Sequence, residues 1–321
     1  MKKILKKFIC FVWLIPLLVC SNGCSTATVG SMGVTPIYKI GILVPAVEHG
    51  WVAGIPYFAE QRCKELNNEI EYKILKAANS EEMASQMNEL TAWGCDAIVA
   101  FPQWKGLEPV FQSVVSQGAI VVNCDIQMNV DGVYTVVGDN KGMGTQSAQY
   151  IVNKIGEKGR VVIVDATTEI SDLSERREAF LEKIKHIAPE IKIVTCQSNF
   201  TREDAENAFA QMLDSHVKID AVYSMDDETS IGVLQAIKKS KRSDIKVVTG
   251  GGGSQEYLKL MSKNKKIWIQ SVLYSPSIAR DAVDMALSAA KGQHLKSPLV
   301  IPTSIIDRSN CKDWQDQNSP Y

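Results

Sequence analysis

The stretch Tyr38–Leu66, YKIGILVPAVEHGWVAGIPYFAEQRCKEL, decides how the rest of the chain is interpreted. It begins with an apolar run typical of a strand, passes through a turn at His49-Gly50-Trp51 and continues with apolar residues at helical spacing. The same order of strand, turn and helix recurs along the chain. The sequence therefore predicts repeated β-α units, with parallel strands covered by helices on both faces.

The alternation breaks after Cys124-Asp125, because Gly132–Val137 is typical of a strand yet has no helix of its own before it. A second series follows, so we expect two α/β halves of similar build joined near residue 138. The expected strands are residues 38–44, 70–77, 96–101, 119–125, 132–137, 160–165, 191–196, 220–224, 244–249 and 267–273, with an extended piece at 299–306. The expected helices are residues 51–67, 80–93, 107–117, 141–155, 174–187, 202–214, 228–239, 254–262 and 276–291. Gly250–Gly253 is expected to be a turn, with Ser254 as the N-cap of the next helix.

The first residues have the pattern of an export signal. Lysines precede an apolar run, Phe8–Cys20, and small polar residues follow it. The run is shorter than the roughly 17–25 residues that a membrane-spanning helix needs, and Pro16 would interrupt a helix.

The residues around Cys24 resemble a bacterial lipobox, in which the cysteine receives a lipid. This resemblance predicts a signal peptide over residues 1–23, and a tether over residues 24–36 that anchors the folded part to a membrane. Because a serine stands where a lipobox usually has leucine, ordinary cleavage after Ala27 stays open.

Charge and cysteine spacing argue against a nucleic-acid-binding protein and against a cysteine metal site. The 35 basic and 36 acidic side chains give a net charge of −1, whereas a nucleic-acid-binding protein would carry a basic patch. Of the eight cysteines, those outside the signal and lipobox have no metal-ligand spacing: Cys63, Cys95, Cys124, Cys196 and Cys311. The apolar surroundings of the first four favour small buried side chains, and disulfide pairs in an exported protein stay open.

Ligands of open α/β sheets bind beyond the carboxyl ends of the strands, so the residues that follow each strand are candidates. These residues are rich in aromatic rings and in groups that make two hydrogen bonds at once. Rings can pack against the C–H faces of a sugar or polyol while Asp, Asn and Arg bind its hydroxyls. We expect ligand contacts from His49, Trp51, Trp104, Asp125, Arg176, Asp226 and Gln270.

Each candidate also has a structural interpretation. Trp51 and Trp104 could pack in the core, and His49 could lie at the surface. Asp226-Asp227-Glu228 could cap the helix that follows, because the helix dipole favours acidic residues there. The glycine run lacks both GxGxxG spacing and GK[ST], and no GxSxG is present. The sequence therefore predicts no cofactor, no metal site and no enzymatic activity.

The order of several motifs resembles the periplasmic sugar-binding proteins of the ribose-binding type, which have the type 1 periplasmic binding protein fold. The motifs are KIGILVP (39–45) with Trp51 after it, VVNCD (121–125), VVGDNKGMG (136–144), SERREAF (174–180), DAVYSMDDETSIGVLQAIKK (220–239) and the strand before the glycines. The resemblance implies two similar three-layer α/β/α lobes, with parallel sheets joined by a hinge of three strands. The N-terminal lobe would comprise residues 37–138 and 274–302, and the C-terminal lobe residues 139–273 and 303–321.

The resemblance also implies roles for single residues. Trp51 would stack on the ligand, Asp125 would grip hydroxyls, Arg176 would bind in a bidentate manner and Asp226 would form the hinge-side wall. Two positions depart from ribose binders, since glycines near Gly251 stand in place of an aspartate, and Leu273 or a neighbour replaces a glutamine. Both departures argue against ribose itself.

For function, the resemblance implies a monomeric lipoprotein that closes on a sugar or polyol and docks on the permease of an ABC importer. The same fold also serves as an extracytoplasmic sensor that signals to a membrane histidine kinase or a chemoreceptor. The sequence leaves this alternative open.

Overall fold

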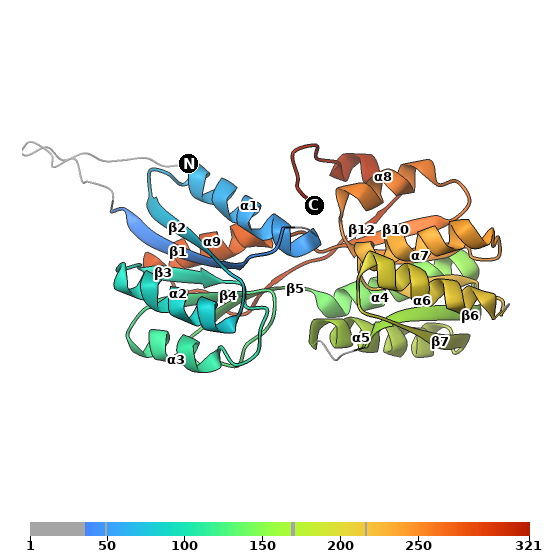
Figure 1. Ribbon diagram of the computed structural model, residues 1–321, viewed down its shortest axis with the longest axis horizontal. Helices are drawn as coiled ribbons and strands as arrows, with labels where there is room; N and C mark the ends of the chain where they lie inside the picture. Colours follow the sequence, from blue (N-terminus) through green and yellow to red (C-terminus); the bar gives the residue numbers. More distant parts are fainter. Residues whose placement is uncertain (1–35, 49, 168–170, 216) are drawn as a thin grey trace, which may run out of the picture. The chain divides into compact units, whose positions relative to one another are not determined.

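The strands form two separate six-stranded sheets in the computed structural model, which describes residues 36–48, 50–167, 171–215 and 217–321 (Figure 1). The first sheet has the order β11-β5-β4-β3-β1-β2, and its neighbouring strands are all parallel. Its strands are β1 (Tyr38–Pro45), β2 (Ile70–Ala77), β3 (Ala97–Ala100), β4 (Ile120–Cys124), β5 (Tyr134–Gly138) and β11 (Leu299–Ile301).

The second sheet has the order β12-β10-β9-β8-β6-β7. Its strands are parallel except for β12, which runs antiparallel to β10 at one edge. They are β6 (Lys158–Ala166), β7 (Glu190–Ser198), β8 (Ala221–Ser224), β9 (Val247–Gly252), β10 (Trp268–Leu273) and β12 (Ile305–Asp307).

Helices cover both faces of the first sheet, because successive side chains of a strand point to opposite sides. Ile40 and Ile42 of β1 pack in one core cluster with α1 and α9, whereas Leu43 packs in another with α2 and α3. The helices are α1 (Gly50–Glu65), α2 (Ser80–Ala92), α3 (Glu108–Ser116) and α9 (Ile278–Ala290). This sheet and these helices are called the first lobe.

The second sheet is covered in the same way. Val161 and Ile163 of β6 face the cluster that contains α4 and α5, and Val162 and Val164 face the cluster that contains α6 and α7. The helices are α4 (Asn140–Ile155), α5 (Ser171–Ile187), α6 (Arg202–Asp214), α7 (Asp227–Ser240) and α8 (Gln255–Lys263), with a 3-10 turn, η1 (Cys311–Trp314), beside α8. This sheet and these elements are called the second lobe.

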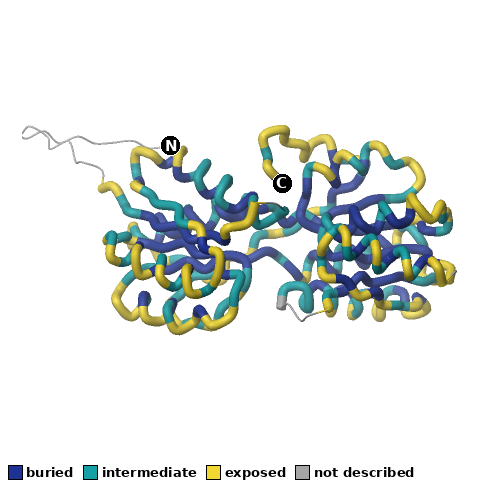
Figure 2. The backbone as a smooth tube through the Cα atoms, in the orientation of Figure 1, coloured by how far each residue is buried: buried dark blue, intermediate teal, exposed yellow. Residues whose placement is uncertain are grey.

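Within the described residues, the connections after β5, after β10 and after β11 each lead from one lobe to the other. The buried residues concentrate along the strands of both sheets (Figure 2). Two three-layer lobes with largely parallel sheets, joined by several segments, confirm the predicted fold class.

The prediction of a turn at Gly250–Gly253 was wrong for its first three residues, which end the buried strand β9. A Cβ on Gly250 would lie 2.4 Å from Asp227 Oδ1, and one on Gly251 would lie 2.6 Å from Met143 Cε. The glycines are therefore needed because side chains of α4 and α7 fill the space beside this strand. Ser254 precedes α8 as expected, but its side chain makes no capping hydrogen bond.

The predicted export signal, Cys24 and nearly all of the tether lie outside the described residues. The cysteines that remain are free in the described part; Cys95 is half-buried and the others are buried. Among the described residues, no helix is long and apolar enough to cross a membrane, and no group of His, Cys, Asp and Glu side chains could hold a metal ion.

Candidate ligand-binding site

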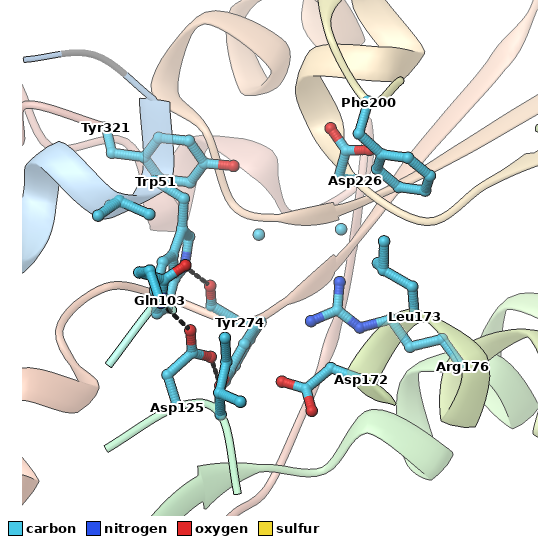
Figure 3. A pocket seen from close by; sticks show the side chains of 14 residues that line it. Trp51, Gln103, Asp125, Asp172, Leu173, Arg176, Phe200, Asp226, Tyr274 and Tyr321 are labelled. Atoms are coloured by element: carbon cyan, nitrogen blue, oxygen red, sulfur yellow. Dashed lines mark hydrogen bonds between the residues drawn. The ribbon is translucent and has the colours of Figure 1, made fainter. Parts of the chain in front are cut away.

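A cavity of about 320 Å³ lies between residues of the two lobes (Figure 3). Its walls lie largely at the carboxyl ends of strands, where open α/β folds bind ligands. The volume is at the small end of the roughly 300–1,000 Å³ of ligand pockets. The described residues that line it are Trp51, Val52, Gln103, Asp125, Ile126, Asp172, Leu173, Arg176, Phe200, Asp226, Gly251, Gly252, Tyr274 and Tyr321.

A stacked pair of aromatic rings, Trp51 and Tyr274, forms one wall. Gly50 adopts a φ of 73°, which turns the chain from β1 into α1 and places Trp51 in the first turn of that helix. The two ring centroids are 5.1 Å apart, and Trp51 Nε1 donates a hydrogen bond to the Tyr274 carbonyl oxygen at 2.5 Å. The indole has no second N–H, so it can offer a ligand its ring but no hydrogen bond.

Asp125 follows β4 and is held by two neighbours. Its φ of 79° lies in the left-handed region, which Asp tolerates better than most residues. Oδ1 accepts a hydrogen bond from the Tyr274 hydroxyl, and Oδ2 accepts one from Gln103 Nε2 at 3.3 Å. Burial raises the pKa of Asp125, and the Tyr274 hydroxyl and the charge of Arg176 oppose this shift. The carboxylate is therefore fixed in orientation toward the cavity.

Arg176 enters the cavity from α5. Helices α4 and α5 approach closely because Gly144 has no side chain; a Cβ there would lie 2.2 Å from the Arg176 carbonyl oxygen. Nε donates to Asn140 Oδ1 at 2.8 Å, and Nη1 donates to the Met225 carbonyl oxygen at 3.1 Å. The guanidinium carbon lies 5.2 Å from the centre of the Tyr274 ring. These contacts fix the guanidinium plane, and no hydrogen bond within the described residues involves Nη2.

Asp226 caps α7, as the structural interpretation of the acidic run expected, and it also lines the cavity; its contact with a ligand stays a prediction. Oδ1 accepts a hydrogen bond from the Thr229 N–H at 2.9 Å. Oδ2 is buried and has no partner among the described residues. Burial raises the pKa of Asp226 to about 6 against the opposing effect of Thr229. A ligand hydroxyl that donates to Oδ2 would satisfy this atom.

Asp227, the next residue, is a structural group. Its Oδ2 accepts hydrogen bonds from the backbone N–H groups of Gly253 and Ser254 and from Ser271 Oγ, at 2.8, 2.7 and 3.0 Å. Burial, the largest cause, raises its pKa to about 7. Asp227 thereby ties α7 to the β9–α8 connection and to β10, behind the cavity wall that Gly251 and Gly252 form.

The cavity brings together four of the residues expected from the sequence, Trp51, Asp125, Arg176 and Asp226. Three expected residues are not among the described residues that line it. His49 lies outside the described residues. Trp104 packs against the core beneath α2 and α3, because the chain after β3 turns toward α3. Gln270 lies inside β10, between Thr249 of β9 and Asp307 of β12, and is fully buried.

The cavity also contains residues that were not selected from the sequence. Tyr274, Phe200 and Asp172 follow strands or lie in the connections after them, so they fall under the same rule, although they were not among the seven expected contacts. Tyr321 follows no strand directly, and no sequence signal pointed to it.

Comparison with known proteins shows the family to which the chain belongs. Residues 40–294 match the periplasmic binding protein domain family. The ribose import binding protein of Bacillus subtilis is 27% identical over 276 residues, covering 83% of this chain and 87% of that protein. A xylitol-binding protein of Mycolicibacterium smegmatis is 27% identical over 245 residues, which cover 74% of this chain and 69% of that protein. The crystal structure of a galactofuranose binding protein has a TM-score of 0.77 at 25% identity, and the match covers 88% of this chain and 100% of that chain.

These proteins are binding proteins and not enzymes, in line with the absence of enzymatic activity that the sequence predicted, and the family implies a location outside the cytoplasm. The match covers most of the chain, and the resemblance noted in the sequence is confirmed. The chain belongs to the periplasmic binding protein domain family.

Proposed function

We propose that the protein captures a sugar or polyol between its two lobes and delivers it to an ABC importer. The observation that carries this proposal is the cavity itself, where a stacked aromatic pair stands beside fixed hydrogen-bonding groups of both charges. The Trp51 ring offers an apolar surface to C–H groups. Asp125 and Asp226 accept hydrogen bonds from hydroxyls, and Arg176 donates to them.

The size of the cavity and the names of the relatives narrow the ligand further. A volume of about 320 Å³ suits a single small ring or a short open-chain polyol better than an oligosaccharide. The relatives are named for ribose and xylitol, and the structural neighbour for galactofuranose. The ligand class is therefore a monosaccharide or a polyol of similar size.

The first test is a ligand panel of D-ribose, D-allose, galactofuranose, xylitol and myo-inositol, measured by thermal shift and then by titration calorimetry. A ligand at about 100 times its Kd is expected to raise the free energy of unfolding by about 2.7 kcal/mol. L-leucine, which presents neither a ring nor a row of hydroxyls, serves as the control and should give no shift. Absence of stabilisation across the whole panel would contradict the proposal.

The partner in the membrane is part of the same proposal. Genes for a permease and an ATPase beside this one would support delivery to an importer. A gene for a membrane histidine kinase or a chemoreceptor in their place would support the sensing role.

The proposal includes a monomeric state and two lobes. The N-terminal lobe comprises residues 37–138 and 274–302, and the C-terminal lobe comprises residues 139–273 and 303–321. The pairing of β11 with β5, and of β12 with β10, supports this division. The protein is also proposed to be tethered to the membrane through residues 24–36.

A lipid on Cys24 makes the tether testable. The variant Cys24→Ser is expected to lose labelling by a fatty acid and to move from the membrane fraction to the soluble fraction, because the thioether-linked lipid can no longer form. Labelling and fractionation of cells that express the full chain measure both effects, with Cys95→Ser as the control. A mature wild-type protein that begins at Thr28 would show ordinary cleavage after Ala27 and overturn the lipid anchor.

A further inference from the structure

The segment that follows β12 runs back to the cavity. After η1, Gln255 of α8 holds the segment at two points: its Nε2 donates to the Trp314 carbonyl oxygen at 3.1 Å, and its Oε1 accepts from the Asp316 N–H at 2.8 Å. From there the chain turns toward α1, and its end lies beside that helix (Figure 1). The segment therefore starts on the second lobe and ends at the first.

Tyr321 ends this segment in a buried place, although most residues just before it are exposed. Its relative exposure is 8%, whereas residues 315–318 are exposed. A Cβ on Gly54 of α1 would lie 3.5 Å from Tyr321 Cβ, and one on Gly252 of β9 would lie 2.3 Å from the Tyr321 hydroxyl oxygen. The residue therefore spans from a helix of the first lobe to a strand of the second, and the glycine at 252 leaves room for the end of its side chain.

The hydroxyl of Tyr321 is directed into the cavity, on the side where Asp226 lies (Figure 3). Its backbone groups bond to Ser319, but no hydrogen bond within the described part of the chain involves the hydroxyl. Burial, together with the nearby carboxylates of Asp227 and Asp226, raises the pKa of Tyr321 well above its usual value. The hydroxyl therefore keeps its proton at neutral pH and can donate it to an oxygen of a ligand.

From these contacts we infer that Tyr321 is a ligand-selecting residue, whose ring sets the length of the cavity and whose hydroxyl donates a hydrogen bond to a ligand oxygen. The inference rests on the proposed function, since it concerns which sugars or polyols the same cavity accepts. Tyr321 closes the end of the cavity that lies next to Trp51, so a substituent on the ligand at that end would meet its ring.

The test compares two substitutions at this position with a control on the same segment. Tyr321→Phe keeps the ring and removes the hydroxyl, and is expected to weaken the best-bound sugar of the panel by about 10-fold. Tyr321→Ala is expected to weaken that sugar further and to shift the ranking toward bulkier probes, namely the methyl glycosides of the panel sugars. Trp314→Ala removes an aromatic side chain that is 39% exposed and does not line the cavity, and should leave affinity and ranking unchanged.

Titration calorimetry of the four proteins separates the possible results, with urea unfolding as the check that each variant is folded. If Tyr321→Phe binds the best panel sugar more weakly than wild type and Trp314→Ala binds it with unchanged affinity, the inference is supported, even where Tyr321→Ala fails to fold. If the wild type binds a panel sugar and Tyr321→Phe and Tyr321→Ala bind it with the same affinity and ranking, the inference is overturned and the proposed function stands. A wild type that binds no probe overturns the proposed function and the inference with it.

Discussion

Replacing Arg176 with alanine is expected to weaken binding of the best panel sugar by roughly 100-fold, about 2.8 kcal/mol. A hydrogen bond from a charged donor contributes about 1.5–3 kcal/mol, and Nη2 is available to make one. The substitution also leaves Asn140 Oδ1 and the Met225 carbonyl oxygen without their donor, and removes the cation beside the Tyr274 ring. Titration calorimetry at pH 7.5 measures the loss.

Arg177 provides a matched control one residue along the same helix. It pairs with Asp165 at 2.9 Å and is not among the residues that line the cavity, so Arg177→Ala should leave the affinity unchanged. Arg176→Lys keeps the positive charge but not the planar fork, and is expected to recover only part of the loss. Equal affinities of Arg176→Ala and Arg177→Ala would remove Arg176 from the site.

Replacing Asp227 with alanine is expected to lower the free energy of unfolding by about 3 kcal/mol. The substitution removes the acceptor of the buried Ser254 N–H and of the Ser271 hydroxyl, whereas the Gly253 N–H keeps its bond to Ser271 Oγ at 3.1 Å. Each buried donor left without an acceptor costs about 1–3 kcal/mol. The substitution also removes the free-energy cost of burying the Asp227 carboxylate, which offsets part of this loss. Urea unfolding measures the change, and Asp131→Ala, at an exposed position, should change stability by less than about 0.5 kcal/mol.

The pH dependence of the free energy of unfolding tests the raised pKa of the Asp227 carboxyl group. Its pKa is about 7 in the folded protein, above the usual value of about 3.9 in an unfolded chain. The folded state therefore binds more protons between about pH 4 and 7, so this group's contribution to stability is present below that window and is lost as pH rises through it. The variant Asp227→Asn lacks this titration, and its stability relative to wild type is expected to rise between pH 5 and 8. Parallel curves for the two proteins would show that Asp227 has no raised pKa.

Apolar periodicity in the sequence was sufficient to predict two α/β halves, whereas the hinge of three strands was implied by the family resemblance. The expected strand at residues 70–77 and the expected helix at 202–214 match β2 and α6 to the residue, because their apolar spacing is regular and turn residues bound them. The end of β9 was not predictable in this way. Whether consecutive glycines form a turn or a strand depends on which side chains fill the space beside them, and Met143 and Asp227 come from distant parts of the sequence.

The candidate site was predicted where a residue directly follows a strand, and missed where tertiary packing decides. Asp125 and Asp226 follow β4 and β8 and line the cavity; their contact with a ligand stays a prediction. Gln270 lies inside the expected strand 267–273 and inside β10, so the rule on residues that follow strands did not apply to it, and its side chain is buried within the sheet. Tyr321 lies at the end of a segment that Gln255 holds by two hydrogen bonds, and no local pattern in the sequence encodes these contacts.

The interrupted course of the chain affects how the first lobe is assembled. One face of its sheet is covered largely by α9, whose Ile278, Ala282 and Val283 share a core cluster with Ile40 and Ile42 of β1. That helix comes after every strand of the second lobe except β12. When the ribosome has made the first five strands, this apolar face of the sheet is therefore covered by α1 but not yet by α9. The contact with α9 closes a long loop, and the entropy of loop closure opposes it. Neither lobe can be cut out as one continuous fragment, and the two are completed together as the last segments arrive.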